Sequence, residues 1–335
     1  MKVLRTAWDR LLNVRPRSLP RDLWTGWQSL GPTAQGLGVF LVVLGAIGPV
    51  LPVALFVFLI LFMIYATWAY SLNLITGMTG YVSFGHVVFV GTGAYALGYA
   101  VTAWKIAPLA GVAMGGLSGA ILALGIGAVT LRLRGSYFAI ATLVTPLAAF
   151  SIVSATPALG DGSGISLNLG FQIGSQYYTI WALLAAEVAL TWWTTRGRLG
   201  LGIRALREDE DAARAVGINV PRLKLFLYVL SGGFAGAAGS VLAWFSSGAF
   251  PESSFNLAFS LDMLAMIIIG GMGTRLGPML GAVIVYVPYQ TLLRVLPRGQ
   301  PIAIGILVIL IALFLPGGIV GILRKYVPEA RRYLE

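Results

Sequence analysis

Long apolar runs separated by short polar turns make up most of this 335-residue chain. A helix needs about 20 apolar residues to cross the roughly 30 Å of hydrocarbon in a bilayer. The runs therefore predict an all-α, polytopic integral membrane protein with about ten transmembrane helices, some of them broken or short. The predicted spans are residues 34–51, 53–75, 82–102, 107–130, 136–154, 177–195, 224–248, 260–274, 278–296 and 301–323. They divide the chain into an N-terminal tail (1–33), a transmembrane domain (34–323) and a C-terminal tail (324–335).

The main polar interruption is residues 196–223, between the sixth and seventh predicted spans. Extended to Lys224, this segment holds seven basic and four acidic residues, about a third of all the charge in the chain. A charged helical segment on one side of a membrane protein is typical of a handle that a soluble partner binds. The alternative is a solvated amphipathic loop that contacts no partner.

The composition supports the membrane interpretation. Hydrophobic residues make up 58% of the chain and charged residues only 10%, whereas soluble domains are about 25% charged. The net charge is +11, but the basic residues lie at the ends of the spans and not in a patch with aromatic residues, so we do not expect nucleic-acid binding. With both termini in the cytoplasm, 20 of the 23 basic residues fall on the cytoplasmic side, as the positive-inside tendency requires.

Several kinds of chemistry lack their residues in this sequence. The absence of cysteine and the single histidine exclude disulfides, thiolate metal sites and multi-histidine metal sites. No GxxxxGK[ST] phosphate-binding loop and no HExxH pair occurs. We therefore expect no enzyme activity, and no metal or cofactor, in this chain itself.

Two glycine-rich segments, residues 77–98 and 270–281, interrupt the apolar runs. A broken helix at membrane depth is tolerated where it lines a cavity, because its exposed backbone groups must find partners. Freed amides there can hold a carboxylate, and freed carbonyls an ammonium. The segments therefore indicate a substrate pathway, although simple cytoplasmic turns with close glycine packing fit them equally well. The candidate pathway residues are Ser83, Gly85, His86, Tyr95, Glu187, Gly270, Gly271 and Gly273.

His86 and Glu187 stand out as ionisable residues inside predicted spans. An unpaired charge at mid-span costs about 3 kcal/mol or more, so each must be neutral, paired or facing water. Each is either a pathway group or a hydrogen-bonded structural residue. Acting together they would suit an ion-coupled secondary carrier, which is the alternative function of another class.

Small residues recur every four positions in two spans, a pattern typical of helices that cross closely. We interpret both sets as packing surfaces and not as ligand sites. They are Gly111, Gly115 and Gly119 in one span, and Gly232, Gly236 and Ser240 in the other.

Four blocks of the sequence resemble a known family. In chain order they are SLNLITGMTGYVSFGHVVFVGTGAYALGY, LRLRGSYFAIATL, GRLGLGIRALREDEDAARAVGINVPRLKLFLYVLSGGFAGAAGSVLAW and AMIIIGGMGTRLGPMLGAVIV. Together they resemble the LivM-type permease subunits (LivH/LivM permease family) of ABC importers for branched-chain amino acids. The resemblance covers about residues 55–325 and leaves out the 1–33 tail.

The resemblance implies a multi-pass protein of a prokaryotic plasma (inner) membrane. Its expected partners are a LivH-like second permease subunit, two ABC ATPase subunits that bind ATP and Mg, and a periplasmic or extracellular substrate-binding protein. The chain would translocate what the binding protein delivers. Related systems carry urea, short amides and other small amino or carboxylic acids, and these remain alternative substrates because LGDGSGISL stands where relatives often show TGGxxGL.

The resemblance also implies a short cytoplasmic helix that docks on the ATPase. Here Asp211-Ala212-Ala213 and Gly217 look like the E-A-A…G pattern of that helix, although Pro221 follows the glycine more closely than in the usual pattern. Small alanines permit close docking, and the neighbouring charges offer salt-dependent contacts. The candidate coupling residues are Arg207, Glu208, Asp211, Ala212, Ala213 and Gly217.

Overall fold

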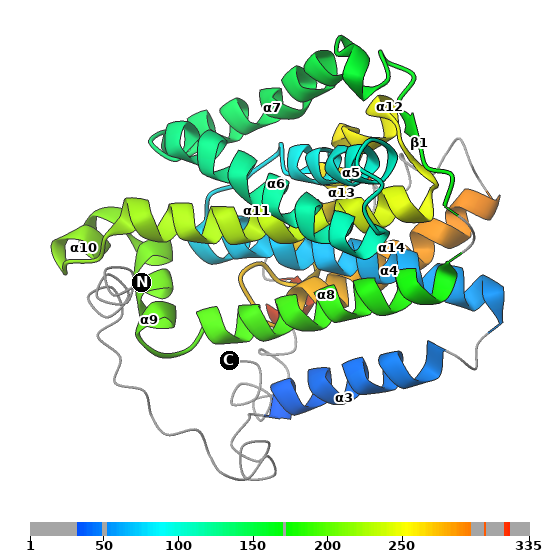
Figure 1. The fold of residues 1–335 in the computed structure, drawn as a ribbon. Helices are drawn as coiled ribbons and strands as arrows, with labels where there is room; N and C mark the ends of the chain where they lie inside the picture. The colour runs from blue at the N-terminus through cyan, green and yellow to red at the C-terminus, as the bar shows by residue number, and fades with distance from the viewer. Residues whose placement is uncertain (1–31, 49–51, 170–171, 296–304, 306–317, 322–335) are drawn as a thin grey trace, which may run out of the picture.

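Apolar helices pack side by side in the computed structural model of the chain (Figure 1). The structure describes residues 32–48, 52–169, 172–295, 305 and 318–321. Its long helices are α3 (Pro32–Ile47), α4 (Val53–Leu72), α5 (Val87–Thr102), α6 (Pro108–Thr130), α7 (Ser136–Ser154), α8 (Ile173–Thr194), α11 (Val220–Phe245), α13 (Leu257–Gly270) and α14 (Gly277–Val295). Its shorter elements are η2 (Asn73–Gly77), η3 (Pro157–Leu159), β1 (Ile165–Ser166), α9 (Gly197–Glu208), α10 (Glu210–Ala215), β2 (Gly248–Ala249) and α12 (Pro251–Ser254).

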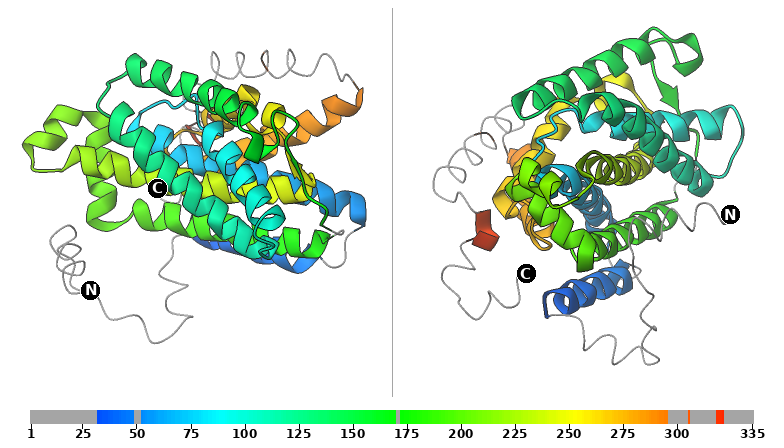
Figure 2. Two further views of the ribbon diagram at one scale, coloured as in Figure 1. Left: turned by 45° about the horizontal axis from the view of Figure 1, so that its top comes forward. Right: turned by 90° about the vertical axis from the view of Figure 1, so that its left-hand side faces the viewer.

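Helices α4 and α11 lie at the centre of the bundle, and the other long helices pack around them (Figures 1 and 2). Most of α4 is buried, and Trp68 near its C-terminal end has no exposed surface. Helix α3 lies on the outer side of α8, where the Trp181 indole donates a hydrogen bond of 2.8 Å to the Leu41 carbonyl. These two central helices are the most buried of the apolar spans, whereas α6 and α7 are more apolar than α11 and yet largely exposed.

The small-residue stripes of α6 and α11 face each other, as the packing interpretation predicts. A Cβ atom on Gly119 would overlap the carbonyl oxygen of Gly232, and one on Gly236 would lie 2.5 Å from the carbonyl oxygen of Gly115. The Ser240 hydroxyl completes the contact by donating a 2.8 Å hydrogen bond to the carbonyl of Gly93 in α5. Since no side chain separates these backbones, α5, α6 and α11 form one tightly packed layer.

The predicted helical, polytopic architecture agrees with the structure, but the count of ten spans is not confirmed. Within the described residues, five helical segments are long and apolar enough to cross a membrane by length and composition: Val53–Gly77, Pro108–Thr130, Ser136–Ser154, Val220–Phe245 and Pro251–Gly270. Shorter apolar helices occupy Ala34–Ile47, Val87–Thr102 and Gly277–Pro288. Helix α8 has sufficient length but contains Glu187 and several polar residues. Most of the predicted span 301–323, and nearly all of both tails, lie outside the described residues.

The predicted span 82–102 is wrong at its start. The preceding helix passes through the π-helical turn η2 and ends before Gly80, whose φ of +78° is a conformation that ends a right-handed helix. Residues 80–86 are not helical, and α5 begins only at Val87. The glycine-rich segment therefore breaks the helix, as predicted, but the non-helical stretch is 80–86 and not the gap 76–81 between the predicted spans.

The predicted span 260–274 is wrong at its end. Helix α13 stops at Gly270, because Gly271 has a φ of +122° and turns the chain out of the helix. A loop of residues 271–276 follows before α14 begins. This second interruption is also real, and it is a loop between two helices.

The two ends of the bundle differ in character (Figure 1). At one end lie α9 and α10, which form the charged segment predicted at 196–223. At the other end, β1 in the connection between α7 and α8 pairs antiparallel with β2, with Ile165 opposite Ala249. This short ribbon, which the sequence pattern did not indicate, ties that loop to the end of α11.

Candidate coupling segment and substrate pathway

The turn between α9 and α10 is built by its own residues. The Asp209 carboxylate caps α10 by accepting hydrogen bonds from the amides of Asp211 (2.8 Å) and Ala212 (2.9 Å). Helix α10 ends at Ala215, Gly217 follows with a φ of +86°, and the Ile218 amide bonds back to the Ala213 carbonyl at 3.1 Å. A glycine fits this left-handed position without steric cost. The sequence therefore specifies the short helix and its stop locally.

The predicted coupling residues face different ways. Ala213 is buried, in a small cluster with Leu206 and Val220 that holds α9, α10 and α11 together. Glu208, Asp211, Ala212 and Gly217 are exposed, and so is Val216, which has 75% of its surface accessible. We call Glu208, Asp211, Ala212 and Val216 the outer face of the segment. Ala213 packs inside the chain and does not belong to this face.

Lys224 anchors the segment to the bundle. Its side chain is 2% exposed, and its Nζ donates to the Tyr81 hydroxyl (2.9 Å), the Glu210 carboxylate (3.2 Å) and the Leu131 carbonyl (3.3 Å). The Tyr81 hydroxyl in turn donates to the other oxygen of Glu210. One ammonium therefore joins α11, α10, the turn after α6 and the broken segment before α5.

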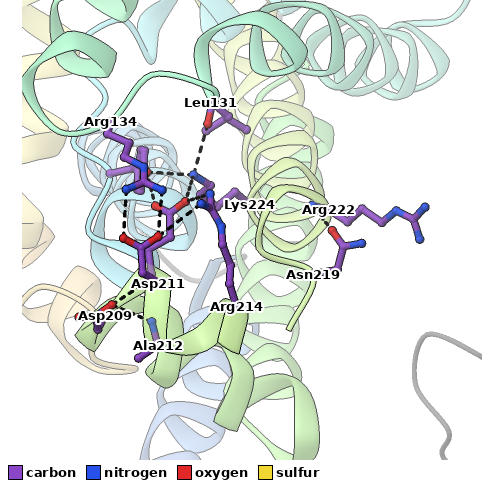
Figure 3. A network of polar contacts seen from close by, with 11 residues as sticks. Leu131, Arg134, Asp209, Asp211, Ala212, Arg214, Asn219, Arg222 and Lys224 are labelled. Atoms are coloured by element: carbon purple, nitrogen blue, oxygen red, sulfur yellow. Dashed lines mark hydrogen bonds and ion pairs between the residues drawn. The ribbon is translucent and has the colours of Figure 1, made fainter. Parts of the chain in front are cut away.

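An outer layer of ion pairs surrounds this buried contact (Figure 3). Arg134 forms two bonds to the Asp211 carboxylate, at 3.0 and 3.2 Å, and Arg214 binds both Glu210 and Asp211. Burial alone would raise the pKa of Glu210, but the hydrogen bonds from Tyr81 and Lys224 and the nearby positive charges outweigh it and lower the pKa. The hydrogen bond and charge of Arg134 likewise lower the pKa of Asp211. Both carboxyl groups are therefore ionised at neutral pH.

The two glycine-rich segments meet beside the end of α9. Asn73, in the π-helical turn, accepts a hydrogen bond from the Gly273 amide (2.8 Å) and donates one to the Thr274 carbonyl (3.2 Å). Arg207 donates to the Met272 carbonyl at 3.2 Å. Gly273 has a φ of +75°, and a Cβ atom there would overlap both the Arg207 guanidinium and the Gly77 carbonyl. Loop 271–276 is thus held between α4 and the predicted coupling segment.

Several backbone amides of the first break have partners in the surrounding protein. Hydroxyl groups accept hydrogen bonds from the amides of Ser83, Phe84 and Val87, at distances of 3.2, 3.2 and 2.9 Å. The acceptors are Thr76, Thr142 and Ser260, from three different elements. Gly85 packs directly on the Thr142 carbonyl, where a Cβ atom would overlap the oxygen. Neighbouring protein groups therefore occupy the amides of Ser83, Phe84 and Val87 and leave no room for a side chain at Gly85.

His86 is fully buried at the start of α5 and joins three helices. Its Nε2 lies 2.7 Å from the Ser71 hydroxyl in α4 and 3.2 Å from the Ser231 hydroxyl in α11. Ser71 has one proton, which it donates to the Ser231 carbonyl at 2.7 Å, so the contact with His86 assigns the imidazole proton to Nε2. These contacts agree with the interpretation of His86 as a hydrogen-bonded structural residue and not as a pathway group.

The remaining pathway candidates are not gathered at one point. Tyr95 is buried and stacks on Phe255 with ring centres 5.9 Å apart. Glu187 is fully buried on α8, which packs against α4, and neither carboxylate oxygen has a hydrogen-bond partner among the described residues. Gly270 contacts the start of α14, where a Cβ atom would overlap the Gly277 carbonyl. The structure thus brings Gly273 next to Gly77 of the first glycine-rich segment, and leaves Tyr95 and Glu187 in separate buried places.

Sequence reasoning missed several residues of this region. Asn73, Tyr81, Arg134 and Lys224 form most of its polar contacts, and Val216 is the exposed apolar residue of the outer face. Two of them carry a signal that was available, because Asn73 is a polar residue in an apolar run and Lys224 lies at the start of one. Tyr81 and Arg134 carry none, since their partners are more than 70 residues away.

Comparison with known proteins identifies the family. The profile described as "Branched-chain amino acid transport system / permease component" matches residues 54–319, which include the central bundle, both glycine-rich breaks and the α9–α10 segment. No solved structure gives a significant match.

Curated relatives agree with this match. LivM of Escherichia coli (strain K12), a high-affinity branched-chain amino acid transport system permease protein, is 28% identical over 299 residues, covering 78% of this chain and 69% of the relative. LivH of Salmonella typhimurium, a permease protein of the same kind of system, is 30% identical over 50% of this chain and 55% of its own. The ribose import permease protein RbsC of Haemophilus influenzae is 28% identical over 53% of this chain and 56% of its own. A multi-pass helical chain with this match belongs to the family of branched-chain amino acid transport system permease components.

Proposed function

We propose that this chain is the permease subunit of a prokaryotic inner-membrane ABC importer, and that the importer carries branched-chain amino acids. It would pair with a LivH-like permease, receive substrate from an external binding protein, and move it when two separate ATPase subunits hydrolyse ATP. The ATP and Mg would be bound by those subunits. The family match over residues 54–319 carries the proposal.

The coverage of the relatives favours an amino acid over a sugar. The LivM relative aligns with 78% of this chain, whereas the ribose permease aligns with 53%.

Coupling to the ATPase would use the outer face of α9 and α10, with two routes into the bundle. A displacement of α10 moves α11 through the Glu210–Lys224 contact. A displacement of α9 moves loop 271–276 through the hydrogen bond from Arg207 to the Met272 carbonyl, and that loop is bonded to Asn73 in η2, just before the other glycine-rich segment. Motion at the outer face therefore reaches both glycine-rich segments through direct contacts.

The substrate is tested with the chain co-purified with the ATPase, permease and binding-protein products of neighbouring genes. Calorimetry on the binding protein should detect leucine, isoleucine or valine and no ribose, and proteoliposomes should take up the same solutes when ATP is supplied. Binding of ribose, urea or a short amide alone would replace the proposed substrate. Uptake by this chain alone on an ion gradient would instead establish the ion-coupled carrier that uses Glu187 and His86.

The coupling face is tested by reversing its charge. Glu208→Lys with Asp211→Lys should leave ATP hydrolysis running while uptake is lost. Because Asp211 also pairs with Arg134 inside the chain, the control is the swap Asp211→Arg with Arg134→Asp, which keeps that ion pair and still inverts the outer charge. The swap should also impair uptake. Normal uptake by the swapped protein would mean that Asp211 serves only the internal pair.

The route through Arg207 has a matched control on the same helix. Arg207→Ala should reduce uptake per ATP hydrolysed, because it removes the bond to loop 271–276. Arg204 is also exposed on α9 and has no hydrogen bond or ion pair with the described residues, so Arg204→Ala should behave as wild type. Equal effects of the two substitutions would contradict the proposed route.

A further inference from the structure

A cavity of about 470 Å³ lies between the ends of α6 and α11 and the short helix α10. Its volume is within the range of about 300–1,000 Å³ that small-molecule sites occupy. The proposed coupling route uses only the Glu210–Lys224 contact in the wall of this cavity, and gives the cavity itself no role. The lining residues are Gly127, Ala128, Leu131, Arg132, Glu210, Arg214, Pro221, Lys224 and Leu225.

The cavity has a cationic floor. Arg132, Arg214 and Lys224 line it with a single carboxylate, Glu210, so its lining carries a net charge of +2. Lys224 and Arg214 each donate a hydrogen bond to the Glu210 carboxylate. Arg132 is exposed, and its side chain has no hydrogen bond or ion pair with the part of the chain that the structure describes. A guanidinium has five N–H donors in a planar fork, the geometry that binds phosphate oxygens in pairs.

The start of α11 adds to this field. Pro221, Lys224 and Leu225 belong to the first two turns of this 26-residue helix, so the wall lies at the positive end of its dipole. The Lys224 ammonium is 2% exposed and adds its charge from inside the protein. The attraction for an anion therefore comes from groups that the fold holds in place, in addition to the exposed Arg132.

The opposite wall belongs to the surface that α6 presents outside the bundle. Leu117, Ile121 and Leu124 are exposed on α6, and Ala128 continues the same stripe into the cavity. These positions are spaced by three or four residues, so they share one face of the helix. An acyl chain lying on this stripe would place its headgroup beside Arg132.

We infer that this cavity binds the phosphate headgroup of an anionic phospholipid, with its acyl chains along the exposed stripe of α6. Basic pockets between transmembrane helices on the cytoplasmic side are where such headgroups bind. A free phosphate ion would use the same cationic groups but would gain nothing from the apolar stripe. The lipid would contact the wall formed by α10 and Lys224, and so would stabilise the position of the coupling segment.

The test is native mass spectrometry on the delipidated full-length chain, in the complex in which it is expressed. It is titrated with dioleoyl-phosphatidylglycerol, with dioleoyl-phosphatidylcholine, and with phosphatidylglycerol plus millimolar inorganic phosphate. Arg132→Gln should weaken phosphatidylglycerol binding about five-fold. Ala128→Trp should reduce it by filling the cavity without a change of charge. The control is Arg222→Gln, because Arg222 is exposed and points away from the cluster (Figure 3).

The expected result is a preference for phosphatidylglycerol that both cavity variants lose and Arg222→Gln keeps, with inorganic phosphate a weak competitor. Equal binding of the two lipids would overturn the inference. An equal loss in Arg132→Gln and Arg222→Gln would reduce it to general surface charge and overturn it too. Efficient displacement by inorganic phosphate would identify a free anion as the ligand and exclude the lipid.

Discussion

Replacement of Lys224 by methionine tests how firmly the charged segment is attached to the bundle. The substitution keeps the length and apolar stem of the side chain but removes the ammonium. Three acceptors then lose their donor: the Tyr81 hydroxyl, the Leu131 carbonyl and the Glu210 carboxylate. Glu210 is the costly one, because its side chain is only 14% exposed and carries a charge at neutral pH.

The magnitude follows from this burial. Removal of one partner of a fully buried ion pair costs about 3–5 kcal/mol, because the other charge is left without compensation. Here Arg214 and Tyr81 stay bonded to Glu210, and the carboxylate keeps some contact with water. We therefore expect Lys224→Met to lower the free energy of unfolding by about 2–3 kcal/mol. Arg222→Met, two residues earlier on the exposed surface, should change it by less than about 0.5 kcal/mol.

The assay is SDS titration of the purified chain in mixed micelles, followed by tryptophan fluorescence, with a double-mutant cycle on Lys224 and Glu210. Glu210→Gln alone should also destabilise, since it leaves the Lys224 ammonium buried without its counter-charge. The double variant should be less destabilised than the sum of the single variants by more than about 1 kcal/mol. Effects that add to within about 0.5 kcal/mol would refute the claim that the two groups act as a pair.

Three further predictions use the same region. The folded protein holds the pKa of Glu210 below its ordinary 4.5, so the stability that this carboxylate contributes is present above pH 4.5 and is lost as the pH falls through the lowered pKa. Thermal melts from pH 6 downward should show this loss of stability, and the loss should be smaller in Glu210→Gln. Gly273→Ala should destabilise the protein and abolish uptake, because a Cβ atom there overlaps the Arg207 guanidinium and the Gly77 carbonyl. The control Gly125→Ala has free space around the new Cβ atom and should be neutral or slightly stabilising. Equal melting temperatures for the two variants would contradict the tight loop geometry. Val216→Asp should raise the Kd for the ATPase in a pull-down titration without changing the melting temperature, because Val216 is 75% exposed on the outer face; unchanged binding would exclude Val216 from the docking surface.

Much of the local structure could be predicted from the sequence. The apolar runs, the helix-breaking glycines near Gly80 and Gly271, and the charged helical segment all follow from hydrophobicity and backbone preferences that act over a few residues. The family was also recognisable, since its blocks occur in order along the chain. Boundaries could not be predicted as closely: α5 starts only at Val87, and the amides of Ser83 and Phe84 before it bond to hydroxyl groups from other elements, which no local pattern encodes.

Only the tertiary structure decided which of these pieces meet. Lys224 and Tyr81 are 143 residues apart and Asn73 and Gly273 are 200 apart, yet each pair is within hydrogen-bonding distance. Such contacts depend on how the helices pack, and the close approach of α5, α6 and α11 at small residues sets that packing. In the folded chain Ala213 is buried and Val216 is exposed, although both are apolar residues of one short segment. Sequence determines which segments are helical and apolar, whereas the burial of a given side chain depends on neighbours that only the folded chain supplies.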